Sequence, residues 1–391
     1  MLGKVLMVAS VASMIQQFNM RNIEILQQLG YEVEVACNFE TGNTCSAKQI
    51  ILLKQQLEED GVVWHQIDFA RNVFKVRENA RAYRQLKKLF LENQYQFVHC
   101  HSPIGGVLGR LAAHKYKTRV IYTAHGFHFF KGAPKKNWLL FYPVEKFLSN
   151  YTDELIVINK EDYELAKKKF HMKKLTYIPG VGVNTAVKQS SKEEKEEKRK
   201  ELSVPQEAFL IVQVAEFTPN KNQQTVIKAL EKRNNADIYY VMCGIGSEKE
   251  ALERYVTERH LDKNIRFLGF RKDVHEILQC ADCFVLSSYR EGLSVALMEA
   301  MAEGLPIVCG KIRGNVDLVE DGVGGILVDS GNQDQYVEAF EKLLEKKKNA
   351  PDEFQRMGEE NKKTIEKFSC ERVDEKMREV YQMYNWMERK K

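Results

Sequence analysis

The 391-residue sequence contains no apolar run that approaches the roughly 18 residues needed to span a bilayer. Its start, Met1 to Ser10, has one lysine followed by apolar residues, as a secretory signal would. That run is short, and polar residues Gln16, Gln17 and Asn19 follow it closely, which favours a buried first strand. We therefore expect a cytoplasmic chain that does not cross a membrane.

Paired cysteines and metal-ligand clusters are also scarce. The eight cysteines are scattered singly apart from Cys280 and Cys283, and this C-x-x-C has no second pair at zinc-finger spacing. No Asp-x-Asp pair stands at the end of a predicted strand, and no His/Cys cluster has ligand spacing. We expect reduced thiols, no cofactor and no bound metal.

The net charge of +5 conceals an asymmetry between the two halves of the chain. Residues 1–180 hold 25 Lys and Arg against 16 Asp and Glu, whereas the remainder holds 34 against 38. Zinc spacing, a helix-turn-helix pattern and RNP-like aromatics are not evident, so a nucleic-acid partner is not expected. An anionic membrane surface suits the basic half better.

Two basic segments bear on that membrane interpretation. The segment from Lys131 to Pro143 sets lysines beside large aromatic and aliphatic groups, a composition that suits a helix lying at a membrane interface. A core helix that begins with solvent-exposed lysines explains the composition of this segment nearly as well. The second segment is equally consistent with a solvated helix face, and its basic residues are Arg71, Lys75, Arg77, Arg81, Arg84, Lys87 and Lys88.

Short apolar runs alternate with helical patterns along the chain, which is typical of parallel sheets covered by helices. In the first half we predict strands at Lys4–Ala9, Glu32–Cys37, Phe97–His101, Val120–Ala124, Glu154–Asn159 and Thr176–Ile178. In the second half we predict strands at Leu210–Ala215, Ile238–Cys243, Ile265–Leu268, Cys283–Leu286 and Pro306–Cys309. Helical patterns include Phe18–Gln28, Arg77–Glu92, Lys160–Phe170 and Val295–Ala302. The fold class is α/β.

The alternating pattern forms two blocks, which predict two Rossmann-like domains at residues 1–183 and 206–370. Between them, residues 184–205 include the mixed-charge run from Lys192 to Glu201, whose i, i+4 spacing of opposite charges favours an exposed helix in a charged linker. Residues 371–391 have one apolar face and are predicted to form a helix that packs back on the body.

The segment from Ser287 to Glu299 holds two glutamates, Glu291 and Glu299, eight positions apart across a strand, a loop and the start of a helix. The first N–H groups of that helix, from about Leu293 to Val295, favour a bound phosphate. Eight residues of helix rise about 12 Å, which suits one carboxylate on a sugar ring and the other on a ribose. From the spacing alone, a Glu-rich surface helix is an equally good interpretation.

Further segments occur together and in order: His99 to Gly106, Tyr122 to Gly132, Tyr151 to Asp162, Pro179 to Val183, Asn220 to Gln223 and Ile312 to Asn315. With the Glu-x7-Glu segment, they resemble the retaining GT-B glycosyltransferases of family 4, in particular the bacterial capsular and exopolysaccharide type. The resemblance covers nearly the whole chain. It implies a GT-B fold, in which two Rossmann-like domains face each other across a cleft.

The resemblance implies roles for residues of the second domain. Lys221 matches the lysine against the donor diphosphate, where fixed positive charge stabilises the leaving nucleotide. Glu299 matches the glutamate that binds the ribose hydroxyls, and Glu291 matches the one that contacts the donor sugar and helps place its anomeric carbon. The other donor-binding candidates are Leu293, Ser294 and Val295 at the helix start, Gly244 after a strand, and Arg290.

In the first domain, His125 matches a histidine that faces the donor sugar across the cleft in that family. It follows the strand Val120–Ala124, so it should emerge at the carboxyl end of a parallel sheet, where ligands bind. His101 is similarly placed. We take His125 and Glu291 as the catalytic candidates, and His101 and Asn19 as candidates on the acceptor side.

Two departures from the family pattern stand out. Many relatives carry an arginine beside the diphosphate five residues before the lysine, where this chain has Glu216. Either Lys221 and the helix N-terminus suffice, or Arg290 or Arg313 supplies the missing charge. Relatives also have a glycine pair after the first strand, where this chain has Ser10-Val11-Ala12-Ser13.

The resemblance implies metal-independent transfer of a sugar, with retention, from a nucleotide-sugar donor. The donor is expected to be a UDP-sugar and the acceptor a lipid-linked saccharide, at the inner face of the plasma membrane. Two alternatives remain open. A nucleotide-sugar epimerase would share the fold and the donor, and a non-catalytic donor-binding partner subunit would be consistent with Glu216.

Overall fold

The computed structural model describes residues 2–42, 45–101, 103–233 and 237–386. Ser102 of the His99 segment and residues 387–391 of the predicted last helix lie outside this part. The chain divides into two compact units, the first made of Met1–Val181 with Glu371–Lys391 and the second of Gly182–Cys370. The first unit therefore contains both ends of the chain.

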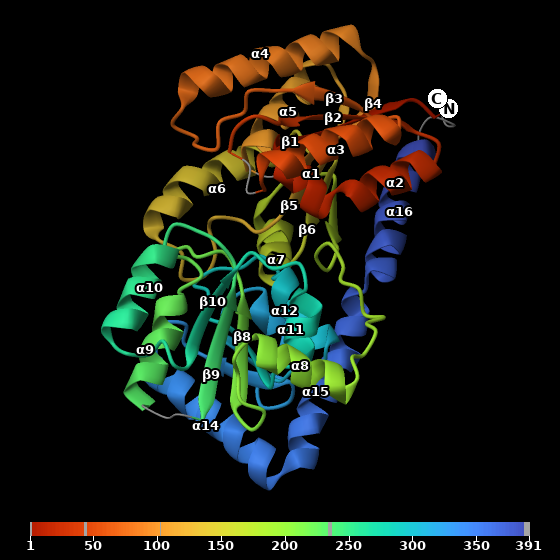
Figure 1. Cartoon of the computed structure of the whole chain (residues 1–391). Helices are drawn as coiled ribbons and strands as arrows, with labels where there is room; N and C mark the ends of the chain where they lie inside the picture. The colour runs from red at the N-terminus through yellow and green to blue at the C-terminus, as the bar shows by residue number, and fades with distance from the viewer. Residues whose placement is uncertain (1, 43–44, 102, 234–236, 387–391) are drawn as a thin grey trace. The chain divides into compact units, whose positions relative to one another are not determined.

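The first unit is built on a seven-stranded parallel sheet with the order β3-β2-β1-β4-β5-β6-β7 (Figure 1). Its strands are β1 (Lys4–Val11), β2 (Glu32–Asn38), β3 (Val63–Gln66), β4 (Tyr95–His101), β5 (Arg119–Ala124), β6 (Glu154–Val157) and β7 (Lys174–Tyr177). β1 and β4 are neighbours in the sheet but not in the sequence. The order therefore reverses direction between them, the position at which open parallel sheets bind ligands.

Helices cover both faces of this sheet, each over its own apolar core. One face carries α1 (Ala12–Phe18), α2 (Met20–Gln28), α3 (Ala47–Glu59) and α16 (Cys370–Trp386). The other carries α4 (Val76–Glu92), α5 (Pro103–Lys115), α6 (Lys135–Ser149) and α7 (Lys160–Lys169). Strand residues alternate between the two cores, as the period of a strand requires.

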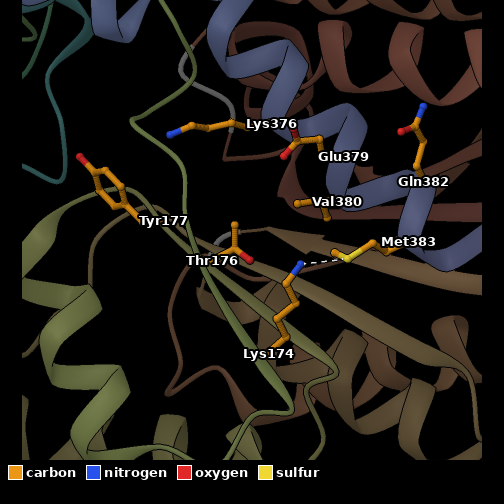
Figure 2. Close-up of a pocket in the computed structure, with 8 residues that line it drawn as sticks. All are labelled: Lys174, Thr176, Tyr177, Lys376, Glu379, Val380, Gln382 and Met383. Carbon is orange, nitrogen blue, oxygen red and sulfur yellow. Dashed lines mark hydrogen bonds between the residues drawn. The ribbon is translucent and has the colours of Figure 1, made fainter.

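The last helix, α16, completes the first unit from the far end of the chain. Its residues Val373, Met377, Val380, Tyr381 and Tyr384 are buried in the same core as β1, β2 and α2. Between α16 and the edge strand β7 lies a groove of about 760 Å³ (Figure 2). Figure 2 shows side chains from the strand and the helix along this groove, including Lys174, Tyr177, Lys376 and Met383.

The second unit has a six-stranded parallel sheet with the order β10-β9-β8-β11-β12-β13. Its strands are β8 (Phe209–Val214), β9 (Ile238–Cys243), β10 (Ile265–Gly269), β11 (Cys283–Leu286), β12 (Ile307–Gly310) and β13 (Gly325–Val328). Its helices are α8 (Lys192–Glu201), α9 (Gln223–Arg233), α10 (Lys249–Glu258), α11 (Val274–Gln279), α12 (Val295–Ala302), α13 (Asn315–Leu318), α14 (Gln333–Asn349) and α15 (Pro351–Ile365), with a 3₁₀ turn at Glu366–Phe368. The order reverses between β8 and β11.

The charged run from Lys192 to Glu201 forms helix α8, as predicted, but it belongs to the second unit rather than to a free linker. Arg199 is buried and its guanidinium reaches Asp282 Oδ2 at 2.9 Å. The same group donates to the carbonyl oxygens of Cys280 and Ala208 at 2.9 Å. A mixed-charge pattern does not reveal that one arginine in it is buried against a sheet.

Every strand predicted from the sequence is present within a few residues, and helix α12 has the predicted bounds. The predictions missed β3 and β13. β3 has the sequence Val-Trp-His-Gln, with only two apolar residues, and β13 begins directly after a glycine-rich turn, so both carry a weak strand pattern. The predicted helix Phe18–Gln28 is wrong at its start, because α1 ends at Phe18 and Asn19 separates it from α2.

Among the described residues, no helix combines the length and the apolar character that crossing a membrane requires.

Candidate functional site

The loops that follow β8 and β11 form the candidate site of the second unit. β8 and β11 pair with each other at the reversal of the strand order, so the chains leaving their carboxyl ends turn to opposite sides. A parallel sheet binds its ligand in the crevice that results. Lys221 follows β8, and Glu291 follows β11, so the topology brings these two predicted residues to the same edge of the sheet.

Lys221 and Glu291 form an ion pair, with Lys221 Nζ 2.6 Å from Glu291 Oε1. The Lys221 side chain is 23% exposed and the Glu291 side chain 11%, so the pair is only partly screened by water. A donor whose phosphate binds Lys221 and whose sugar binds Glu291 would therefore exchange this internal contact for contacts with the ligand.

The backbone around Lys221 is held by side-chain hydrogen bonds to the loops that follow β11 and β13. Asn222 has a left-handed backbone, with φ of 52°, and its buried amide donates to the carbonyl oxygens of Ser287 at 3.2 Å and Ser330 at 2.7 Å. Ser287 Oγ donates to the Lys221 carbonyl oxygen at 2.9 Å. These contacts fix the direction in which Lys221 leaves the loop before any ligand binds.

Two arginines lie beside the ion pair. Asn220 donates to the Arg290 carbonyl oxygen at 3.0 Å, and Arg313 Nε donates to the Glu291 carbonyl oxygen at 3.3 Å. Burial, and then the nearby Arg313 charge, lower the pKa of Arg290 from its ordinary value. Lys221 is thus paired with the Glu291 carboxylate, Arg313 contacts the Glu291 main chain, and Arg290 and Arg313 lie close enough to repel each other, an arrangement that a bound anion would stabilise.

Arg313 was named from the sequence as one of two arginines that could supply the charge missing at Glu216, and its contact with the Glu291 loop is consistent with that alternative. Arg313 follows β12, so it lies at the same carboxyl edge of the sheet as Lys221 and Glu291. Gly314 makes the approach of its loop to the β11 loop possible, because a Cβ there would lie 2.4 Å from the Gly292 carbonyl oxygen. Glu216, in contrast, is exposed.

Helix α12 begins directly after the Glu291 loop. It starts at Val295, and Ser294 is its N-cap, with a side-chain oxygen that accepts from the Leu297 N–H at 3.3 Å. Leu293 is buried just before the cap. The positive end of the helix dipole therefore lies at the same loop as Lys221, Arg290 and Glu291, which is where an anion is favoured.

Glu299 lies in the second turn of α12 and is half-buried. Burial raises its pKa, while the nearby His275 lowers it to a smaller degree. His275 Nδ1 itself lies 2.9 Å from Glu303 Oε1. A buried carboxylate with a raised pKa is well suited to accept hydrogen bonds from hydroxyl groups, since a partner relieves its desolvation.

Gly244 serves the packing of two loops against each other. A Cβ at Gly244 would lie 1.9 Å from the Ala215 carbonyl oxygen, and one at Gly246 would lie 2.3 Å from that of Phe217. Larger residues would therefore push the loops after β8 and β9 apart. The contact of Gly244 with a nucleotide stays a prediction.

In the first unit, a chain of buried histidines ends β4 and follows β5. His99 Nδ1 lies 2.8 Å from the Tyr381 hydroxyl of α16, and its Nε2 lies 2.8 Å from Thr123 Oγ1. His101 Nδ1 lies 3.2 Å from His125 Nε2. The structure thus brings together the two predicted histidines and adds His99, Thr123 and Tyr381, whose roles the sequence did not indicate.

Burial keeps these histidines neutral. It lowers the pKa of His125 to about 4 and that of His99 to about 3, and the pKa of His101 also lies well below its ordinary value. A neutral His125 can donate or accept a hydrogen bond at pH 7 but carries no positive charge there.

The space beside His101 and His125 is small, about 30 Å³, and is lined also by Phe18, Arg21 and Asp374. It has room for about one water molecule. Asn19, the other acceptor-side candidate, is fully buried and donates to the Met14 carbonyl oxygen at 3.0 Å. Its role toward an acceptor stays a prediction.

Comparison with known proteins adds an independent line of evidence. Residues 194–364 match the family model described as glycosyl transferases group 1, and residues 4–159 match the model described as glycosyl transferase 4-like. The chain is 36% identical over 397 residues to the putative glycosyltransferase EpsD of Bacillus subtilis (strain 168), covering 100% of this chain and 99% of that one.

A second relative is the UDP-Gal:alpha-D-GlcNAc-diphosphoundecaprenol alpha-1,3-galactosyltransferase of Escherichia coli, 28% identical over 341 residues and 85% of each chain. Among solved structures, Anabaena Alr3699/HepE in complex with UDP and glucose superposes with a TM-score of 0.77 at 17% identity. That superposition covers 97% of this chain and 99% of the other, and it shows a shared fold.

The histidine pKa values predict how the first unit responds to acid. Because the folded-state pKa of His99 is about 3 and the ordinary value is 6.5, the unfolded chain binds more protons between these values. The free energy of unfolding should therefore fall as the pH is lowered from 6.5 toward 5. His99→Gln should reduce this slope by up to about 1.4 kcal/mol per pH unit.

Urea unfolding followed by tryptophan fluorescence measures this, since Trp64, Trp138 and Trp386 all belong to the first unit. His171→Gln removes an exposed histidine of the same unit and is the control. A slope that His99→Gln leaves unchanged would contradict the assignment.

The ion pair predicts opposite effects of its two members on anion binding. Glu291→Gln removes a negative charge and releases Lys221, so inorganic pyrophosphate should bind roughly fivefold more tightly, or about 1 kcal/mol. Lys221→Met should weaken binding about tenfold. Isothermal titration calorimetry measures both, with Lys342→Met on α14 as an exposed-lysine control. If Glu291→Gln weakened binding as Lys221→Met does, the pair would be structural rather than a site for phosphate.

Proposed function

Because the chain belongs to the group 1 family of glycosyl transferases, we propose that it transfers a sugar from a UDP-sugar to a lipid-linked saccharide in cell-surface polysaccharide biosynthesis. The observation that carries the proposal is the ion pair of Lys221 with Glu291 in the loop before α12, with Arg290 and Arg313 in contact with the main chain of the same two loops. A diphosphate meets three cations and a helix dipole there, and a sugar meets a carboxylate.

The donor assignment follows from this arrangement. Lys221, the arginines and the first turn of α12 bind the diphosphate, with Leu293, Ser294 and Val295 shaping the helix start. Glu299, in the second turn of α12, accepts hydrogen bonds from the ribose. Uridine is supported by two similar proteins: one is named for UDP-Gal, and another was solved with UDP.

The acceptor assignment is supported by the Escherichia coli relative, whose name specifies a GlcNAc linked to diphosphoundecaprenol. We assign acceptor binding to the first unit, with His101 and Asn19 as candidate contacts, and donor binding to the second. An acceptor with a lipid anchor would be met at the inner face of the plasma membrane, where the chain would act as a peripheral protein.

The proposed reaction retains the anomeric configuration. The bond between the anomeric carbon and the leaving phosphate oxygen breaks as a bond to the acceptor oxygen forms on the same face of the sugar. The acceptor proton passes to the leaving phosphate oxygen, so no protein nucleophile is required. Glu291 positions the sugar, and neutral His125 offers it a hydrogen bond.

Charge on the leaving diphosphate is stabilised in this proposal by Lys221, Arg290 and Arg313 together with the α12 dipole. Arg290 and Arg313 thereby supply the positive charge that Glu216 cannot. The transfer rate should accordingly be unchanged by EDTA.

The two other functions are distinguished by their products. An epimerase would change the donor sugar without releasing nucleotide, and a partner subunit would bind the donor without converting it.

A donor screen tests the proposal. Purified protein is mixed with a panel of nucleotide sugars, and both thermal stabilisation and slow hydrolysis to free nucleotide are recorded. One UDP-sugar should stabilise the chain and be hydrolysed. Glu299→Ala should weaken its binding by about 10- to 100-fold, because hydrogen bonds to a charged group contribute about 1.5–3 kcal/mol.

Glu345→Ala, at an exposed position on α14, is the matched control and should behave as the original chain does. A donor that is epimerised would establish the epimerase instead. Binding without any turnover, with or without a saccharide acceptor, would favour the partner subunit.

A further inference from the structure

Helix α6 of the first unit presents large apolar side chains to solvent. Leu139 is 79% exposed and Phe147 is 55% exposed, while Leu140 and Val144 are 40% and 41% exposed. Leu139, Pro143 and Phe147 follow one another at intervals of four residues, so they share one face of the helix. An apolar stripe of this kind on a helix marks an interaction surface.

The opposite side of α6 anchors the helix to its own unit. Trp138, Phe141 and Tyr142 pack on the core that α4 and α5 also share. Glu145, the only acidic residue of α6, is buried and lies 2.8 Å from Arg110. One side of α6 is thus a core face, as one of the two expectations for this segment has it, and the other side is exposed.

The exposed charged residues of α6 itself are all positive. Lys135 and Lys136 stand at the start of α6, and Lys146 stands near its end, all three exposed. None of the three forms an ion pair with any residue that the structure describes. The helix is about 22 Å long. Lysines at both ends of it can reach anionic groups while the apolar stripe between them enters a less polar phase.

We propose that this face of α6 docks on the surface of an anionic lipid bilayer. The proposal rests on the proposed function, since a lipid-linked acceptor is met at such a surface. Leu139, Leu140, Val144 and Phe147 would enter the boundary between head groups and acyl chains, and Lys135, Lys136 and Lys146 would contact lipid phosphates. α6 would lie along the membrane surface without crossing it.

A second copy of the chain fits this face less well. A symmetric dimer places the same surface on both sides of the interface, which would bring two sets of lysines together with no acidic residue of α6 to neutralise them. An anionic lipid surface supplies the opposite charge over the whole length of the helix.

A second segment on the same side of the sheet has a similar character. Val73, Phe74 and Val76 are exposed at the start of α4, and Lys75 and Arg77 lie among them. α4 and α6 both pack on α5, so the two segments belong to one face of the sheet (Figure 1). The basic stretch predicted along α4 is partly a solvated face, since Arg81 and Lys88 have acidic neighbours.

Co-sedimentation with vesicles tests the proposal without any sugar substrate. The chain should bind vesicles that contain phosphatidylglycerol, bind phosphatidylcholine vesicles weakly, and lose binding as salt is added. The double variant Leu139→Glu/Phe147→Glu should bind at least about tenfold more weakly, because two apolar contacts are lost and two negative charges are added. Lys135→Glu/Lys136→Glu should lose the preference for phosphatidylglycerol.

Leu91→Glu is the matched control, because Leu91 is a 74% exposed leucine on α4 of the same unit. It should leave vesicle binding unchanged. Circular dichroism confirms folding of each variant. Vesicle binding by the double variant equal to that of the original chain would overturn the proposal. So would a dimer of the original chain that the double variant abolishes.

The outcome is separable from that of the donor screen. If vesicle binding follows these predictions and no nucleotide sugar binds, the docking surface stands and the proposed function is wrong. If the donor is hydrolysed and the double variant still binds vesicles, only the docking surface is wrong.

Discussion

The ion pair between Lys221 and Glu291 is the interaction around which the candidate site of the second unit is organised. It joins the loops that leave β8 and β11, two strands that are neighbours in the sheet although 70 residues separate the paired side chains. Arg290 and Arg313 place two further cations near this loop, Arg313 through a hydrogen bond to the Glu291 main-chain carbonyl, and α12 adds the positive end of its dipole. Positive charge concentrated beside one carboxylate favours a bound anion, and in the proposed function that anion is the donor diphosphate.

In the first unit, burial rather than neighbouring charge sets the protonation state of the candidate residues. His99, His101 and His125 lie in a chain of close contacts, and desolvation holds all three neutral at pH 7. Tyr381, from the helix that returns to this unit at the end of the chain, orients His99 and so makes α16 part of the histidine cluster as well as of the core. The outer face of the same unit carries the exposed apolar stripe of α6, so one domain combines buried polar groups at a sheet edge with a surface suited to lipid.

Much of this could be predicted from the sequence because it depends on local patterns. Buried strands such as β1 and β11 are short apolar runs, and the bounds of α12 follow from a loop glycine and a run of helix formers. β3 and β13 were not predicted, because β3 has only two apolar residues and β13 begins directly after a glycine-rich turn. The contact of Arg313 with Glu291, the ion pair of Arg199 with Asp282, and the hydrogen bond from α16 to His99 join residues far apart in the chain, and only the folded topology brings them together.

The central claim is that the donor diphosphate binds at the start of α12. A crystal structure of the chain with UDP measures this most directly. The account predicts the β-phosphate within hydrogen-bond distance of Lys221 Nζ and of Arg290 or Arg313, with the ribose hydroxyls on Glu299 and the Lys221–Glu291 contact opened. UDP bound elsewhere, or bound here with the ion pair intact and the arginines turned away from the phosphates, would contradict it.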